Sequence, residues 1–366
     1  MNDTRFDFAI VGAGMAGASL AAELAPHASV LLLEAEDQPG YHATGRSAAF
    51  WDECYGGPDV VPLTLASGGF LREHGLLSPR GALHLARTQD RAKVDAFLDT
   101  FGPTGASIER LDRDQIDAKL GGLRDHWVEA IWEPACADID VGGLHALYLS
   151  KAKAAGVELA VRARVEQAKS SAKGWHIRTA DGREFRADKL VNAAGAWADP
   201  VTEMAGCRPL GITPYRRTVA QLRTTPAPAS DQPLVLDISG RFYFKPESGR
   251  IWLSPHDEEA SPPCDAAPEE LAVATAIDRL QDVVTWQVDR VETKWAGLRS
   301  FAPDRLPVYG PDPSNSDFFW FAGQGGFGIQ TAPAAAQITA CQLLGHSVPD
   351  HLAGINVKKY AATRFA

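Results

Sequence analysis

The apolar residues near the N-terminus fall into three short runs of different character. Residues 6–11 are apolar and rich in aromatic and β-branched side chains, which predicts a buried strand. Residues 18–24 form an apolar stretch of helical character, and residues 29–33 predict a second strand that ends at Glu34. The order strand, helix, strand within so short a segment predicts a βαβ unit with parallel strands.

A glycine pattern joins the first strand to the helix. Gly12, Gly14 and Gly17 have the spacing G-x-G-x-x-G, in which the first permits a tight turn, the second lets the backbone approach a pyrophosphate and the third lets helix and strand pack closely. The phosphates then lie at the positive end of the helix. Glu34 can bind a ribose hydroxyl, so the unit predicts a site for NAD or FAD, which both contain ADP.

Farther along the chain, apolar runs alternate with glycine-rich turns. Residues 189–194 and 317–322 predict buried strands, and the second leads through glycines into a helix at about 330–344. Residues 175–183 predict a hairpin whose turn is Asp181-Gly182. A strand, turn and helix so close to the C-terminus indicate that the chain returns to its first domain.

The segment before this return predicts antiparallel structure. Residues 218–223 and 241–244 are expected to be short strands, and residues 268–284 a helix. The strands are separated by loops that contain Pro226, Pro228, Pro233 and Pro246. We predict an α/β (α+β) fold, in which a Rossmann-like domain with a central parallel sheet interleaves with a smaller domain built on an antiparallel sheet. The expected boundaries place residues 1–80, 140–212 and 300–366 in the nucleotide-binding domain, and residues 81–139 and 213–299 in the substrate-binding domain.

Composition and charge narrow the class of protein. The 366 residues are 45% hydrophobic and 22% charged, as in ordinary globular proteins, and the net charge of −10 argues against a nucleic-acid partner. The five cysteines are far apart and odd in number, which predicts reduced thiols, no metal site and a cytoplasmic protein. The apolar segment 8–22 lacks a basic flank and is too short for a bilayer, so no signal peptide or membrane span is predicted.

Several segments together resemble one family. They are residues 34–49, 77–80, 191–197, 208–211, 216–217, 242–246, 295–301 and 324–331. The chain resembles the FAD-dependent amino-acid oxidoreductases of the D-amino-acid oxidase/glycine oxidase (DAO) superfamily, and within it the likeness is greatest to the bacterial D-arginine and D-amino-acid dehydrogenases.

The resemblance implies a non-covalently bound FAD, and the residues favour a flavin over NAD. The loop 42–49 follows Glu34 closely, and its small side chains allow the backbone to lie along the pyrophosphate and the ring. Glycines at 325, 326 and 328 precede a helix whose N-terminus can stabilise negative charge on a reduced flavin. The predicted cofactor-binding residues are Gly12, Gly14, Met15, Ala16, Gly17, Glu34, Ala35, His42, Thr44, Gly45, Arg46, Ser47, Ala48, Ala49, Val165, Ala194, Gly195, Trp197, Gly325, Gly326, Phe327, Gly328, Ile329 and Gln330.

On the substrate side the resemblance implies a clamp for a carboxylate. Arg217 and Arg299 are expected to bind it, because the planar guanidinium meets both oxygens, and Tyr243 is expected to add a hydroxyl donor. Adjacent residues of a strand face opposite sides, so Arg216 is the alternative to Arg217, as a solvated or flavin-side residue. Tyr55 matches an aromatic lid residue, with core packing as its alternative.

Two positions depart from D-arginine dehydrogenase. Ala82 replaces the acid that pairs with the substrate guanidinium, which predicts a preference for neutral or hydrophobic D-amino acids over D-arginine, unless Asp52 or Glu53 supplies an anion from another direction. Phe50 replaces a histidine, which leaves no evident base for the substrate amine. Residues 256–259, His-Asp-Glu-Glu, lie between prolines and are expected to be a solvated loop rather than a metal site.

The predicted activity is FAD-dependent oxidative deamination of D-amino acids. Hydride passes from Cα to flavin N5, and the imino acid is hydrolysed to a 2-oxo acid and ammonia. The alternatives are oxidation of glycine, of a secondary amine such as sarcosine, or of a 2-hydroxy acid on the same fold, and a non-catalytic flavin- or nucleotide-binding sensor. The expected electron acceptor is a quinone, another carrier or oxygen, and a membrane quinone would bring the protein to the membrane surface.

Overall fold

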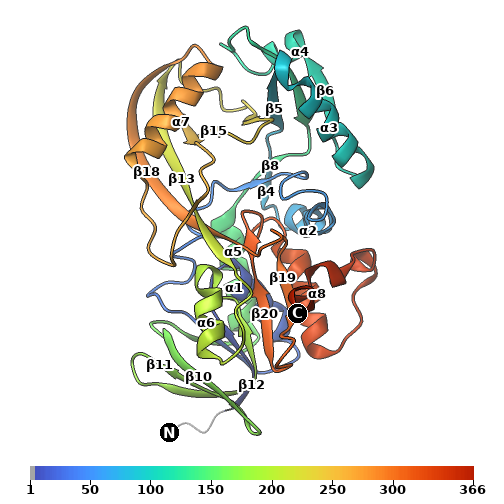
Figure 1. Cartoon of the computed structure of the whole chain (residues 1–366), viewed down its shortest axis with the longest axis vertical. Helices are drawn as coiled ribbons and strands as arrows, with labels where there is room; N and C mark the ends of the chain where they lie inside the picture. Colours follow the sequence, from blue (N-terminus) through green and yellow to red (C-terminus); the bar gives the residue numbers. More distant parts are fainter. Residues whose placement is uncertain (1–4) are drawn as a thin grey trace.

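Two large β-sheets lie one above the other along the long axis of the molecule (Figure 1). The computed structural model describes residues 5–366. A third, small sheet consists of β3 (Phe50–Trp51), β8 (Ala137–Ile139) and β4 (Leu77–Pro79). No helix among the described residues is long and apolar enough to cross a membrane.

The lower sheet contains the predicted βαβ unit. β1 (Arg5–Val11) is followed by α1 (Met15–Leu24) and β2 (Val30–Leu33), and β1 pairs in parallel with both β2 and β12 (Glu184–Asn192). Alternate residues of β1 pack into two different apolar clusters, one on each face of the sheet. Because both faces are covered at Phe8–Val11, these four residues of β1 are all apolar, whereas Arg5 and Asp7 at its start are exposed.

The remaining strands of this sheet are β9 (Glu158–Ala160), β10 (Val165–Ser171), β11 (Gly174–Thr179), β19 (Val308–Pro311) and β20 (Phe318–Ala322). The helices that accompany it are α2 (Val61–Glu73), α5 (Val141–Ala154), α6 (Ala198–Met204) and α8 (Ala332–Leu344). α1 packs against α5 and α8, and α2 packs against α8. The predicted hairpin forms between β11 and β12, and β11 also pairs with β10, the edge strand of this sheet.

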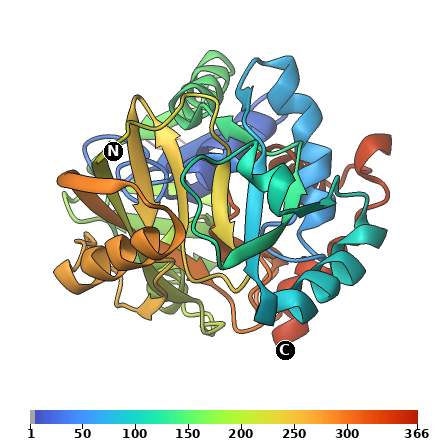
Figure 2. The same ribbon diagram turned by 90° about the horizontal axis from the view of Figure 1, so that it is seen from above.

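The upper sheet has ten strands, and only its β14–β5 pair is parallel. Its members are β5 (Ala82–Arg87), β6 (Glu109–Asp112), β7 (Trp127–Glu133), β13 (Thr213–Thr225), β14 (Leu234–Asp237), β15 (Tyr243–Glu247), β16 (Arg250–Ser254), β17 (Glu259–Ala260), β18 (Gln287–Phe301) and β21 (Gln324–Gly325). Seen from above, its strands in cyan, yellow and orange run across the molecule (Figure 2). The accompanying helices are α3 (Arg91–Phe101), α4 (Arg113–Asp117) and α7 (Glu270–Val283).

The predicted fold class is confirmed, with differences in two strands. β13 extends well beyond residues 218–223, because it pairs along its whole length with the slightly longer β18. Pro246 lies inside β15 and not in a loop. β15 pairs with β14 only at Tyr243 and Phe244, so the missing N–H of Pro246 removes no hydrogen bond on that side. The domain boundaries stay a prediction, and residues 1–4 lie outside the described residues.

The two long strands connect the sheets. β13 and β18 run from the upper sheet down to the lower part of the molecule (Figure 1). The last residues of β18 pair with β21, and β18 also contacts the 3-10 turn Gly195–Trp197 that follows β12. Side chains near the C-terminal end of β18 therefore lie where the two sheets meet.

A buried polar cluster joins the segment after β3 to the upper sheet. Asp52, His84 on β5 and Glu133 on β7 are 1%, 7% and 0% exposed, and His84 Nε2 lies 2.6 Å from Glu133 Oε1. The two carboxylates and the imidazole place ligand atoms within 4.8 Å of one another, but the 2.6 Å contact is a hydrogen bond that leaves no room for an ion between its atoms. Burial raises the pKa of Glu133 to about 7 and that of Asp52 well above its ordinary value.

Because of Glu133, we expect the free energy of unfolding to fall by roughly 1 to 3 kcal/mol as the pH rises from about 5 to about 8. In the unfolded chain a glutamate releases its proton near its ordinary pKa, whereas folded Glu133 holds the proton up to a pKa of about 7. The folded state thus binds more protons over this range, and stability falls with increasing pH. Chemical denaturation at several pH values measures the slope, which should flatten in Glu133→Gln. The exposed Glu73→Gln serves as the control, and an equal slope in Glu133→Gln and wild type would contradict the explanation.

Candidate active site

The glycine turn of the βαβ unit has the close packing that its sequence predicts. Gly12 has φ +101°, and a Cβ added at Gly17 would lie 1.8 Å from the Gly12 carbonyl oxygen. Glu34, at the end of β2, accepts hydrogen bonds through Oε2 from the N–H of Ala13 (3.0 Å) and through Oε1 from that of Glu36 (3.0 Å). The acidic side chain is therefore held beside the turn, as ribose binding requires.

A single elongated cavity extends from this turn to the C-terminal part of β18. It is lined by most of the predicted cofactor-binding residues: Gly12, Gly14, Met15, Ala16, Glu34, Ala35, His42, Thr44, Arg46, Ser47, Val165, Ala194, Gly195, Trp197, Gly325, Gly326, Gly328 and Ile329. It continues to Arg217 and Arg299. One cavity thus joins a dinucleotide site at one end to two guanidinium groups at the other.

The loop 42–49 closes over the turn through specific contacts. The N–H of Met15 donates to Thr44 Oγ1 (2.9 Å), at the first turn of α1. The His42 ring packs on Trp197 at 4.6 Å between centroids, and its Nε2 lies 2.9 Å from Glu36 Oε1. Arg46 pairs with Asp265 and donates to two backbone carbonyls, so it binds protein groups rather than standing free for a phosphate.

Six predicted cofactor-binding residues lie outside the cavity lining: Gly17, Gly45, Ala48, Ala49, Phe327 and Gln330. Gly17 packs beneath the turn, and Ala48 lies in an apolar cluster with Tyr243. Gln330 Nε2 donates to the carbonyl oxygen of Asp52 (3.0 Å) and to Thr64 Oγ1 (2.9 Å), which anchors the segment before Tyr55. Contact between these six residues and FAD stays a prediction.

Sequence reasoning missed other residues that line the cavity. Among them are Glu36, Arg164, Cys264, Ser300 and Gln324. Gln324 directly precedes the predicted glycine run, so its position next to predicted cofactor-binding residues could have identified it as a lining residue. No local pattern marks Arg164 or Cys264, which reach the cavity only because distant segments fold over it.

The two clamp arginines lie on neighbouring strands. Arg217 on β13 is opposite Gly297 of β18, and Arg299 is two residues farther along β18, opposite Tyr215. The two guanidinium-bearing residues are therefore diagonal neighbours on one face. Arg217 is 3% exposed, and burial together with the like charge of Arg299 lowers its pKa to about 10. Arg216 points to the other face of β13, where it pairs with Glu269.

Aromatic side chains surround the arginines. Tyr55 Oη lies 2.5 Å from Arg299 Nη1, and a Cβ at Gly326 would clash with both groups. The ring of Phe50 is 5.8 Å from that of Tyr55 and 5.5 Å from that of Tyr243. The structure thus brings together all four predicted substrate-side residues, Tyr55, Arg217, Tyr243 and Arg299.

The expectation of a solvated loop at residues 256–259 is wrong for His256 and Asp257, which are only partly exposed, whereas Glu258 and Glu259 are exposed as expected. Arg217 Nε donates to the Asp257 carbonyl oxygen (2.8 Å), and Arg217 Nη2 pairs with Glu258 at 2.9 Å. The Asp257 carboxylate accepts hydrogen bonds from the N–H and hydroxyl of Thr218 (2.7 and 2.8 Å). A buried arginine and its neighbour on β13 hold the segment against the site, which a charge pattern alone does not reveal.

Comparison with known proteins identifies the family. The family model described as DAO, FAD dependent oxidoreductase, matches residues 7–342. The chain belongs to the DAO family. The cofactor of this family is FAD, and the cavity that begins at the glycine turn fits it. The family predicted from the sequence is confirmed, whereas the particular likeness to D-arginine dehydrogenase stays a prediction.

Relatives of this DAO-family chain are distant. It is 24% identical over 426 residues to FAD-dependent oxidoreductase domain-containing protein 1 of Bos taurus. The matched region covers 99% of this chain and 85% of that protein. It is 27% identical over 228 residues to monomeric sarcosine oxidase of Bacillus sp. (strain B-0618), over 59% of this chain and 57% of that protein. The crystal structure of glycine oxidase from Geobacillus kaustophilus superposes with a TM-score of 0.84 at 23% identity, over 98% of this chain and 99% of that one.

Gly17→Ala should lower the FAD content of the purified protein several-fold. The added Cβ would meet the backbone oxygen of Gly12 at 1.8 Å, so the turn that approaches the pyrophosphate would have to move. The flavin-to-protein absorbance ratio measures the effect. Gly69→Ala in α2 is the matched control, because nothing lies within 4 Å of its added Cβ. It should keep its flavin, and a full flavin content in Gly17→Ala would refute this role of the turn.

Proposed function

We propose that this DAO-family enzyme oxidises an α-amino acid with a neutral side chain and of D configuration. Bound FAD would accept hydride from Cα at N5, and water would hydrolyse the resulting imino acid to a 2-oxo acid and ammonia. The observation that carries the proposal is the pair of neighbouring guanidinium groups at one end of the cofactor cavity. Two positive charges so placed favour a ligand with a carboxylate.

Unused hydrogen-bond donors support a carboxylate at this position. Arg217 Nη1 and Tyr243 Oη are buried and have no hydrogen-bond partner in the described part of the chain. Buried polar groups are costly unless they are paired, so these atoms favour a bound ligand that accepts hydrogen bonds. A carboxylate accepts at both oxygens and also reduces the repulsion between Arg217 and Arg299.

The surroundings of Tyr243 favour a neutral side chain. Tyr243 belongs to an apolar cluster with Ala82, Cys136 and Leu234, against which Phe50 packs. This cluster includes Ala82, where D-arginine dehydrogenase has its acid by the sequence resemblance. A substrate guanidinium would lose its hydration here without gaining an opposite charge, which costs free energy and disfavours a cationic side chain.

The two acids considered as substitutes for that group are already engaged by the protein. Asp52 Oδ1 accepts hydrogen bonds from the N–H groups of Cys54 (2.9 Å) and Tyr55 (2.8 Å). Glu53 accepts one from the N–H of Ser107 (2.7 Å). Asp52 Oδ2 has no hydrogen-bond partner among the described residues, but burial raises the pKa of this carboxyl well above its ordinary value and so disfavours the negative charge that would attract a cationic substrate.

The D configuration is proposed from the sequence resemblance, and the likeness to monomeric sarcosine oxidase favours a secondary amine as the second candidate. Anaerobic reduction of the flavin with matched D- and L-amino acids, sarcosine and 2-hydroxy acids separates them. We expect neutral D-amino acids to bleach the flavin fastest and to release ammonia. A faster reaction with sarcosine, which releases a primary amine, would replace the first candidate with the second. A best substrate of L configuration would overturn the stereochemical assignment, and D-arginine as the best substrate would overturn the assignment of side chain.

Arg217→Lys should lower kcat/KM on the order of 100-fold, because an ammonium group does not reproduce the two-point contact of a guanidinium with a carboxylate. Arg216→Lys is the matched control, one residue away on the opposite face of β13, where Arg216 pairs with Glu269. Its kcat/KM should stay within about 2-fold of wild type. Steady-state kinetics and the binding of simple carboxylates measure both variants. Equal losses in the two variants would refute a specific carboxylate contact by Arg217.

A further inference from the structure

His256 lies beside the carboxylate clamp in an unusual backbone conformation. Its φ is +56°, a left-handed conformation that is uncommon for a residue other than glycine. Its ring lies 5.9 Å from that of Tyr243, at an interplanar angle of 77°. The next residues, Asp257 and Glu258, contact Arg217 directly. Such backbone conformations persist where surrounding contacts hold them, and they occur often at functional sites.

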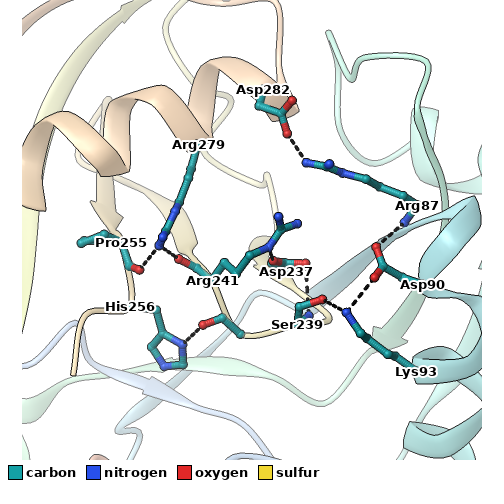
Figure 3. A network of polar contacts seen from close by, with 11 residues as sticks. Arg87, Asp90, Lys93, Asp237, Ser239, Arg241, Pro255, His256, Arg279 and Asp282 are labelled. Carbon is teal, nitrogen blue, oxygen red and sulfur yellow. Dashed lines mark hydrogen bonds and ion pairs between the residues drawn. The ribbon is translucent and has the colours of Figure 1, made fainter.

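A network of hydrogen bonds from several elements fixes this residue (Figure 3). His256 N–H donates to Ser254 Oγ (3.1 Å), and Arg279 of α7 donates to the carbonyl oxygens of Pro255 (2.5 Å) and Arg241. Arg241 in turn pairs with Asp237 at the end of β14. The position of His256 is therefore set by α7 and by the turn between β14 and β15.

The same network determines which ring nitrogen carries the proton. His256 Nδ1 lies 2.5 Å from the carbonyl oxygen of Gly240, and a carbonyl oxygen only accepts hydrogen bonds (Figure 3). Nδ1 therefore donates, and in the neutral ring Nε2 is left as an acceptor. Nε2 makes no hydrogen bond to any residue between 5 and 366 and is not fully buried, so it can accept one from water or from a ligand.

The charges around His256 keep its ring neutral. Burial and the positive charges of Arg217, Arg299 and Arg305 lower its pKa to about 3. Asp257 and Glu258 lie nearby, but their carboxylates are engaged with Thr218, Arg217 and Arg305. Nε2 is thus an acceptor at every pH at which the enzyme is expected to work. The same positive charges disfavour a bound ammonium group and favour the neutral amine.

We propose that His256 Nε2 accepts a hydrogen bond from the α-amino group of the substrate and so orients its Cα–H for oxidation. The inference rests on the proposed function, because it requires a substrate with an N–H next to Cα whose carboxylate is held by Arg217 and Arg299. The substrate reacts as the free amine after its ammonium has lost a proton to solvent. The Cα–H bond then breaks with its electron pair going to FAD, and the nitrogen lone pair forms the C=N bond. No proton moves to His256 in this step.

Two variants separate the acceptor from the structural role of the ring. In His256→Asn the side-chain amide can still donate to Gly240 in place of Nδ1, and asparagine tolerates the left-handed conformation, but the acceptor at the Nε2 position is lost. In His256→Gln the longer side chain can return an acceptor to the Nε2 position. We expect His256→Asn to bind FAD normally and to reduce the flavin about 10- to 100-fold more slowly. His256→Gln should recover part of that rate.

The probes are two pairs that differ only in the α-amino group: D-alanine with propionate, and D-leucine with 4-methylpentanoate. Flavin reduction reports on the amino acids, and perturbation of the flavin spectrum reports on binding of the carboxylates. We expect His256→Asn to bind the carboxylates as wild type does. A wild-type reduction rate in His256→Asn would overturn the proposal, and so would an equal loss of amino-acid reduction and carboxylate binding. If no amino acid reduces the wild-type flavin, the proposed function itself fails, and the role of His256 fails with it.

Discussion

Arg217 and Arg299 lie as diagonal neighbours on one face of two antiparallel strands, and their like charges repel, which lowers the pKa of the buried Arg217. The surrounding protein compensates this repulsion only in part. Glu258 pairs with Arg217 from one side, and the Tyr55 hydroxyl meets Arg299 from the other. The remaining positive charge at this end of the cavity favours an anionic group over a cationic one. It also sets the electrostatic conditions for every neighbouring group, including the neutral imidazole of His256.

The architecture explains how such a pair is held in place. β13 and β18 are long enough to belong to the upper sheet and also to reach the lower part of the molecule, where the cofactor cavity lies. Their pairing over most of their length makes the arginine positions part of a rigid sheet rather than of loops. The absence of a side chain at Gly297 lets Arg46 pack against the strand, which ties the cofactor loop to the same sheet. The loop 42–49 and the two arginines are thus held by one pair of strands.

Two polar residues outside the cavity lining, Asp52 and Gln330, support the segment that carries Tyr55. Asp52 binds the backbone N–H groups of Cys54 and Tyr55, and Gln330 binds the carbonyl oxygen of Asp52. These contacts fix the segment that carries Tyr55, although neither side chain needs to touch a ligand. The buried cluster of Asp52, His84 and Glu133 links this segment to β5 and β7 of the upper sheet, and Gln330 links it to the segment before α8.

The sequence by itself determined the features that depend on local spacing. The glycine turn with Glu34 follows from one βαβ unit. The alternation of side chains along a strand implies that only one of Arg216 and Arg217 faces the site, and the family resemblance favoured Arg217. Only the tertiary structure decided which distant segments meet. Residues 256–258 have an exposed-loop pattern in sequence, yet Asp257 and Glu258 bind Arg217, which lies about forty residues earlier in the chain. Asp52, His84 and Glu133 come from three separate segments. Such contacts depend on long-range strand pairing, and local hydrophobic patterns do not specify which strands pair.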